Sequence, residues 1–168
     1  MKSGFVNIIG NPNVGKSTLM NRLVSERISI ITSKAQTTRH RIMGIVNGSA
    51  GDGSGHGDFQ IVYSDTPGIL KPGYKLQESM MRSVRGAVQD ADVILYVTDT
   101  VEGAAASGNH PSERNADIVE SIRASGILTI VIINKIDLST PEAVGTMVQR
   151  WETLLPGAQI VATSALAG

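Results

Sequence analysis

FVNIIGNPNVGKS, residues 5–17, places a short apolar run directly before a loop bounded by two glycines. The apolar run 5–9 predicts a strand, and the helical spacing of apolar residues in 17–24 predicts a helix. The connecting loop 10–17 fits the pattern G-x-x-x-x-G-K-[ST]. In that pattern, backbone N–H groups and the positive end of the helix surround a phosphate. The stretch therefore predicts a strand, a phosphate-binding loop and a helix.

The rest of the chain alternates apolar runs with helical patterns. Further strands are predicted at 42–46, 59–63, 93–97, 128–133 and 159–162, and further helices at 75–90, 111–125 and 141–155. The runs 93–97 and 128–133 are apolar throughout, which is typical of strands buried on both faces of a parallel sheet. The pattern predicts a three-layer α/β domain with a mostly parallel sheet and one antiparallel hairpin. Ligands of such sheets bind beyond the carboxyl ends of the strands.

Composition limits the class of protein. The 168 residues are 41% hydrophobic, which suits one domain spanning 1–168. Fifteen acidic residues balance fifteen basic ones, so bulk charge does not indicate nucleic-acid binding. The chain has no cysteine, which excludes disulfides and thiolate sites and is typical of the cytoplasm. It also has no apolar span long enough for a membrane helix, so no integral membrane segment is expected.

The glycine-bounded loop supplies the predicted phosphate contacts. Lys16 would reach the β- and γ-phosphates of a nucleotide, and Ser17 would bind a magnesium ion. The alternative is a strand-to-helix turn that binds nothing, which the flanking strand and helix disfavour. The predicted nucleotide-binding residues of this stretch are Asn11, Asn13, Val14, Gly15, Lys16, Ser17 and Thr18.

A second motif, Asn134-Lys135-Ile136-Asp137, follows the apolar run 128–133. Asp137 would accept hydrogen bonds from both N–H groups on the Watson–Crick edge of guanine, whereas adenine would leave the carboxylate unpaired. Such pairing discriminates by roughly 10⁴–10⁵-fold, enough to select GTP over ATP. Asn134 and Lys135 belong to the same predicted site. Ser164-Ala165-Leu166 fits a backbone contact with the base, and an ordinary turn remains an equal alternative there.

Two further segments are predicted to sense the γ-phosphate. Asp65-Thr66-Pro67-Gly68 follows the run 59–63, so that Asp65 could hold magnesium through water and the Gly68 N–H could meet the γ-phosphate. The same four residues also suit a turn, and the two interpretations are compatible. In the polar segment 33–41, Thr38 rather than Thr37 is predicted to bind magnesium, from its spacing to Lys16.

The predicted metal set is therefore Ser17, Thr38 and Asp65, and the predicted catalytic set is Lys16, Asn13, Thr38 and Gly68. Ile69 follows Gly68, where many GTPases place a water-orienting glutamine, so intrinsic hydrolysis is predicted to be slow. The leading hypothesis is a GTP-hydrolysing molecular switch. A GTP-dependent binding module with negligible hydrolysis is the alternative, and a kinase is disfavoured because no acceptor pocket can be identified.

Together, G-N-P-N-V-G-K-S-T-L-M-N-R-L, K-A-Q-T-T-R-H-R, D-T-P-G and N-K-I-D resemble the Era family of bacterial GTPases over nearly the whole chain. K-A-Q-T-T-R-H-R is the specific part, because related ribosome-assembly GTPases are expected to differ there. The resemblance implies a Ras-like P-loop fold, GTP and GDP as ligands, and Mg²⁺ as cofactor. It also implies a cytoplasmic switch, with an option of peripheral membrane association, that assists small ribosomal subunit assembly through 16S rRNA.

The chain departs from the family pattern in two places. Family members continue into an RNA-binding KH domain, whereas this sequence ends at Gly168. The resemblance therefore implies a G domain without its last helix and without the KH domain, and with part of one sheet face uncovered. The glycine-rich stretch Gly48–Gly57 is longer than a hairpin needs and is interpreted as a surface insertion.

Two other features concern single residues. Asn13 occupies the position that resembles potassium-dependent GTPases, so it could help to hold K⁺ near the β- and γ-phosphates. Lys34, Arg39, His40 and Arg41 form a basic cluster, which is interpreted as a solvated face rather than a partner contact.

Overall fold

A computed structural model of the chain describes residues 2–31, 38–49, 57–101 and 115–167. Several predictions fall outside these ranges: Lys34 and Thr37, most of the glycine-rich stretch, and the start of the helix predicted from residue 111. The described elements are β1 (Lys2–Gly10), α1 (Lys16–Val24), β2 (Ile42–Gly48), β3 (Phe59–Asp65), α2 (Lys75–Gln89), β4 (Val93–Asp99), α5 (Ala116–Ser125), β5 (Leu128–Asn134), the 3₁₀ turn η1 (Ile136–Leu138), α6 (Pro141–Leu154) and β6 (Gln159–Ala162).

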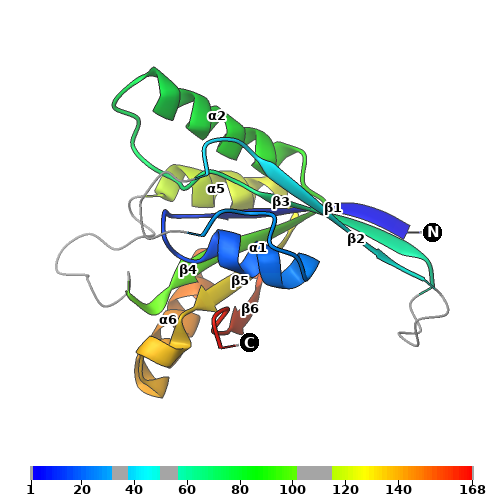
Figure 1. Cartoon of the computed structure of the whole chain (residues 1–168). Helices are drawn as coiled ribbons and strands as arrows, with labels where there is room; N and C mark the ends of the chain where they lie inside the picture. The colour runs from blue at the N-terminus through cyan, green and yellow to red at the C-terminus, as the bar shows by residue number, and fades with distance from the viewer. Residues whose placement is uncertain (1, 32–37, 50–56, 102–114, 168) are drawn as a thin grey trace.

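The strands form one mixed sheet. Its six described strands have the order β2-β3-β1-β4-β5-β6. β2 pairs with β3 in antiparallel fashion, and every other neighbouring pair is parallel. The parallel strands end at the left of Figure 1, on the side away from the N-terminus. The predicted fold class is confirmed, including the single antiparallel hairpin.

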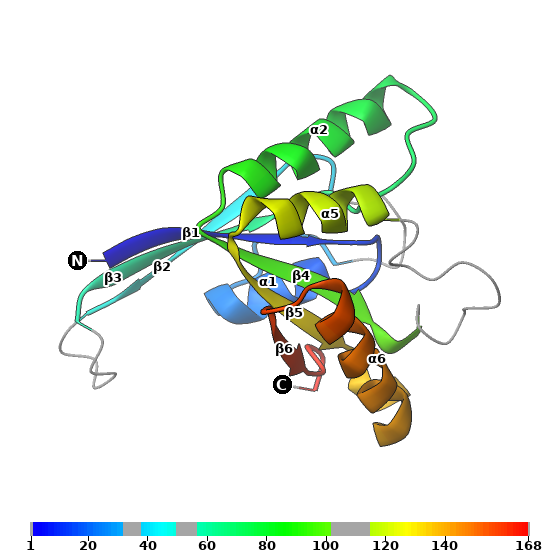
Figure 2. The ribbon, with the colours of Figure 1, turned by 180° about the vertical axis from the view of Figure 1, so that it is seen from behind.

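Helices cover both faces of the sheet. One core cluster joins the sheet to α2, α5 and α6 and includes Tyr96 and Trp151, whose rings lie 4.9 Å apart. The other cluster packs Met20 of α1 against Ile8 and Leu95. Figure 1 views the molecule from the α1 side, and Figure 2 shows α5 and α6 on the opposite face. The fold is thus a three-layer arrangement.

The strands extend beyond the predicted apolar runs. β3 continues to Asp65, β4 to Asp99 and β5 to Asn134. These polar residues stay in the ladder, where Asp65 pairs with Ile8 and Asp99 pairs with Asn134. An apolar run therefore ends before its strand does, because the last residues of each strand carry polar side chains at the ligand edge. The ladder brings these side chains to that edge.

The described helices leave parts of the sheet uncovered. On the α1 side, Leu128 of β5 is 53% exposed and Val161 of β6 is 44% exposed. On the α2 side, Met43 and Ile45 of β2 are also more than half exposed. In the part of the chain that the structure describes, no helix combines the length and apolar character needed to cross a membrane.

The first glycine of the phosphate loop predicts a large stability effect. A Cβ atom added at Gly10 would lie 2.1 Å from the backbone oxygen of Val97, which β4 holds in place. We expect Gly10→Ala to cost about 3 kcal/mol or more in the free energy of unfolding. Gly145 of α6 is the control, because nothing lies within 4 Å of its added Cβ. Gly145→Ala should instead stabilise the chain by about 0.5–1 kcal/mol. Urea unfolding of both variants tests this contrast, and equal effects would contradict it.

Candidate functional site

A pocket of about 450 Å³ opens at the carboxyl ends of the parallel strands. Its wall combines the phosphate loop, the first residues of α1, the turn after β5 and the segment after β6. The lining residues are Pro12, Asn13, Gly15, Lys16, Ser17, Thr18, Ile30, Ile31, Thr38, Gly68, Asn134, Lys135, Asp137, Ser164, Ala165 and Leu166. The sequence motifs thus come together around one cavity. Of the predicted site residues, Asn11, Val14 and Asp65 are buried behind this wall.

The phosphate loop has the backbone shape expected of an anion cradle. Gly15 has φ 99°, and an added Cβ would lie 2.2 Å from the side-chain nitrogen of Asn134. Asn13 also has a positive φ, 64°, a conformation that asparagine adopts more readily than most residues. Lys16 is 6% exposed, and its ammonium group donates to the backbone oxygen of Asn11 at 2.7 Å. The Lys16 ammonium group therefore lies against the phosphate loop, where it would contact a bound phosphate.

The predicted magnesium residues converge. The Ser17 hydroxyl donates to Oδ2 of Asp65 at 2.7 Å and lies 3.3 Å from Oγ1 of Thr38. Asp65 has no exposed surface, and its Oδ1 has no hydrogen-bond partner among the described residues. Burial raises the pKa of Asp65, while the Ser17 hydrogen bond and the charge of Lys16 oppose the rise. A buried carboxylate with an orphaned oxygen beside two hydroxyls is a donor set that suits Mg²⁺.

The motif Asn134-Lys135-Ile136-Asp137 begins at the last residue of β5, and its three polar side chains differ in their surroundings. The Asn134 side chain donates to the Val14 oxygen at 2.9 Å and accepts from the Ala165 N–H at 2.9 Å. It therefore ties the phosphate loop to the segment after β6. The Lys135 ammonium donates to the Asn13 oxygen at 2.6 Å and pairs with Asp99 at 2.5 Å.

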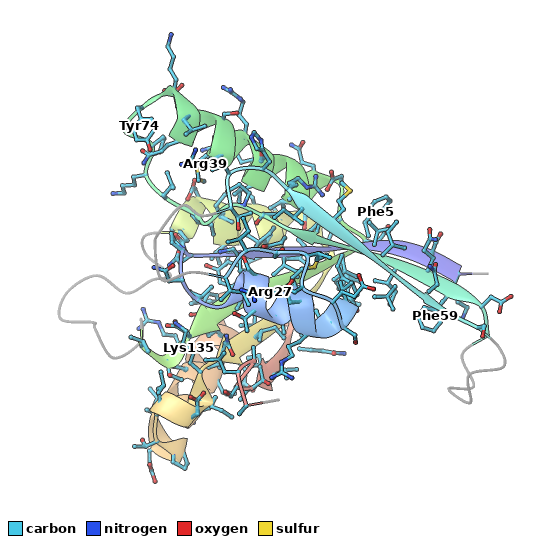
Figure 3. All side chains as sticks on the ribbon, viewed as in Figure 1. Phe5, Arg27, Arg39, Phe59, Tyr74 and Lys135 are labelled. Atoms are coloured by element: carbon cyan, nitrogen blue, oxygen red, sulfur yellow. The ribbon has the colours of Figure 1, made fainter. Side chains whose placement is uncertain are left out.

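Asp137 differs from its two neighbours in the motif. It lies in η1, its side chain is exposed, and it lines the pocket. Figure 3 shows Lys135 of the same motif at the edge where the parallel strands end. The Asp137 carboxylate is therefore accessible to a nucleotide base bound in the pocket.

The segment after β3 is fixed against the phosphate loop. The Ile69 N–H donates to the Gly10 oxygen at 3.0 Å, and a Cβ at Gly68 would lie 2.8 Å from the backbone nitrogen of Pro12. Ile69 itself is 5% exposed and packs in the core on the α2 side. Its side chain is therefore a packing residue in this structure.

Several residues that the sequence did not single out belong to the site. Asp99 is 2% exposed and holds the Lys135 ammonium. Asn115, just before α5, donates to the Asn11 side chain at 2.6 Å. Ile30 and Ile31 line the pocket and are 65% and 44% exposed. The sequence signal that could have indicated their place in the site is an apolar pair beside a polar segment.

The interpretation of the basic cluster as a solvated face is wrong for one of its members. The Arg41 side chain is only 18% exposed and makes several hydrogen bonds across the sheet. Lys34 lies outside the described residues, whereas Arg39 and His40 are exposed. Counting charges along the sequence cannot separate an inward guanidinium from outward ones.

Comparison with known proteins places this site in a family. The sequence model of a family described as 50S ribosome-binding GTPase matches residues 5–135. The GTPase Era of Clostridium botulinum (strain Eklund 17B / Type B) is 38% identical over 167 residues, which are 99% of this chain and 52% of that protein. The chain thus spans about half the length of the curated relatives that it matches.

Solved structures agree with this result. A variant of Aquifex aeolicus Era bound to GDP·AlF4− superposes with a TM-score of 0.83 at 37% identity, covering 100% of this chain and 53% of the other. Era in complex with MgGDPNP and nucleotides 1506–1542 of 16S ribosomal RNA gives the same score, identity and coverage. The chain therefore belongs to the 50S ribosome-binding GTPase family and has the Ras-like G-domain fold of Era.

Proposed function

We propose that residues 1–168 form a G domain that binds GTP and GDP with Mg²⁺ and hydrolyses GTP as a molecular switch. One observation carries the proposal: the glycine-bounded phosphate loop and the exposed Asp137 line the same pocket. The match to relatives named as GTPases supports it. The alternative, a binding module without hydrolysis, is not favoured by these relatives.

The chain's own residues would divide the work as follows. Lys16 and the loop amides would bind and neutralise the phosphates, and the Gly68 N–H would meet the γ-phosphate. Ser17, Thr38 and Asp65 would hold Mg²⁺, Asp65 through water. When bound, Mg²⁺ supplies positive charge that stabilises the phosphoryl oxygens. Asp137 would read guanine, and the backbone of 164–166 would support it.

Hydrolysis is proposed to be slow without a further group. The attacking water needs a hydrogen-bonding group to orient it, and a supplied arginine is worth roughly 10³–10⁵-fold in P-loop GTPases. Ile69 is buried and cannot form a hydrogen bond through its side chain. Single-turnover hydrolysis of GTP by the purified chain tests both points. Complete absence of GDP product would remove the enzymatic part of the proposal and leave the binding part intact.

We also propose that K⁺ assists hydrolysis at Asn13. Asn13 lines the pocket, and its exposed side chain lies on the loop that would surround the phosphates. A potassium ion there would add positive charge beside the β- and γ-phosphates. We expect faster turnover in KCl than in NaCl for the wild type, and equal rates in the two salts for Asn13→Ala.

This comparison uses the ratio of rates within each variant. Asn13 has φ 64°, so alanine adds backbone strain at that position. The strain affects both salts alike and cancels in the ratio. Equal rates in KCl and NaCl for the wild type would contradict the potassium proposal, as would an unchanged ratio in the variant.

The wider role is proposed from the relatives. Era has been solved with a segment of 16S ribosomal RNA, and we propose that this chain is part of a protein that assists small ribosomal subunit assembly in the cytoplasm. Peripheral membrane association, an option in the family, belongs to the same proposal. Co-sedimentation of the full-length protein with small subunits, with GTP and with GDP, tests the ribosomal role.

A further inference from the structure

Arg41 ends the segment 38–41, and its side chain connects this segment to three other elements. Its Nε donates to the Ser64 hydroxyl of β3 at 2.9 Å. One terminal nitrogen donates to Oδ2 of Asp90, at the end of α2, at 2.6 Å. The other donates to the Asn7 side chain of β1 at 3.1 Å and to Oδ1 of Asp90 at 3.3 Å. The planar guanidinium thus donates hydrogen bonds to Asp90 through both terminal nitrogens and to the two strands through Nε and one terminal nitrogen.

The partners of Arg41 are themselves fixed. Asn7 and Ser64 have no exposed surface. The Asn7 side chain donates to the Ala87 oxygen of α2 at 2.7 Å and to Oδ1 of Asp90 at 2.6 Å. The network therefore joins the start of β2, the strands β1 and β3, and the last turn of α2. A lysine could supply the charge at this place but could not reproduce the fork.

This network lies close in sequence to two of the predicted magnesium residues, Thr38 and Asp65. Thr38 is three residues before Arg41, and Ser64 is the residue before Asp65. The antiparallel ladder of β2 and β3 begins only at the pair Ile42 and Asp65. Residues 38–41 therefore precede the ladder, and the hydrogen bonds of the Arg41 side chain attach the end of this segment to β1, β3 and Asp90.

We propose that Arg41 is a positioning residue that sets Thr38 against Ser17 and couples this placement to the end of α2. The inference rests on the proposed GTP switch. Thr38 and Gly68 would act only when a γ-phosphate is bound, whereas Lys16 and Asp137 would hold GDP and GTP alike. Loss of Arg41 should therefore weaken the binding of GTP and leave that of GDP nearly unchanged.

The test compares Arg41→Gln and Arg41→Lys with the wild type. Calorimetry with Mg²⁺ measures the affinity for GDP and for the analogue GDPNP, and thermal unfolding measures stability. We expect GDPNP affinity to fall about tenfold in both variants, with GDP affinity changing less than about twofold. The Mg²⁺ concentration for half-maximal GDPNP binding should rise. The lysine variant should not rescue binding, because the fork is lost.

Two further variants keep the test decisive. Asp90→Asn retains the guanidinium and its bonds to Ser64 and Asn7. It should therefore also lower the affinity for GDPNP but not for GDP, by a smaller factor than the Arg41 variants. Arg85→Gln is the matched control, because Arg85 lies on α2 in an exposed pair with Asp117 at 3.8 Å. It should bind both nucleotides as the wild type does. If Arg41→Gln does not fold, Asp90→Asn and Arg41→Lys decide the question.

The outcomes separate the inference from the proposed function. Equal losses of GDP and GDPNP affinity in the Arg41 variants, or a lower unfolding temperature with unchanged affinities, would overturn the positioning role. A wild type that binds neither nucleotide would instead overturn the proposed function. Selective loss of GDPNP affinity in the Arg41 and Asp90 variants, but not in Arg85→Gln, supports the inference.

Discussion

Asp137→Asn is expected to lower the affinity for GDP by a factor on the order of 10⁴ and to create a preference for xanthine nucleotides. Guanine presents two N–H donors to the Asp137 carboxylate, and the variant amide would face one of them with its own donor. Xanthine has an oxygen in place of the guanine amino group, so the amide of the variant would pair with it. Calorimetry with GDP and XDP measures both effects.

XDP binding is the internal control of this experiment. A variant that binds XDP is folded and has an intact phosphate loop, so its loss of GDP affinity must come from the base. Asp137 is exposed, and no residue of η1 is buried, so the substitution is not expected to disturb the core. Unchanged preference for GDP over XDP would show that another group reads the base.

Asp65→Asn is expected to change stability and function in opposite directions. The variant removes a buried negative charge, so the chain without Mg²⁺ should unfold at a higher temperature than the wild type. It also removes a predicted magnesium residue, so Mg²⁺-dependent GDPNP binding should weaken about 10- to 100-fold. Thermal unfolding and calorimetry, each with and without Mg²⁺, measure these effects.

The stability gain expected for Asp65→Asn should depend on pH in a definite direction. Because burial raises the pKa of Asp65, the folded chain binds this proton more tightly than the unfolded chain does. Without Mg²⁺, the folded state therefore loses stability as the pH rises from the ordinary pKa of aspartate, about 3.9, to above the raised value. The stability gain of Asp65→Asn should grow over the same window. A gain that shrinks with rising pH would contradict this explanation.

The elements and the ligand edge could be predicted from the sequence because their signals are local. Apolar runs gave the strands, and the glycine-bounded loop gave the first turn of α1. The order of motifs also placed Lys16, Ser17 and Asp137 around one cavity, which the structure shows. These residues lie in or just after short connections that begin where β1 and β5 end, so knowing the strands is enough to place them at that edge.

The contacts that join distant elements could not be predicted in the same way. Arg41 and Asp90 are 49 residues apart, and Asn11 and Asn115 are 104 residues apart. Nothing in the local pattern of either partner indicates the other. Asn134 shows a related limit: the motif predicts a nucleotide-binding role for it, whereas in the structure its side-chain amide binds Val14 and Ala165. These roles depend on the sheet order, which brings the partners together.

Calorimetric titration of the purified chain with GDP and with ADP, both in the presence of Mg²⁺, tests the central claim most directly. The phosphate loop and the Asp137 carboxylate line the same pocket, so we predict tight GDP binding and ADP binding weaker by a factor on the order of 10⁴. ADP binding as tight as GDP binding would contradict the account.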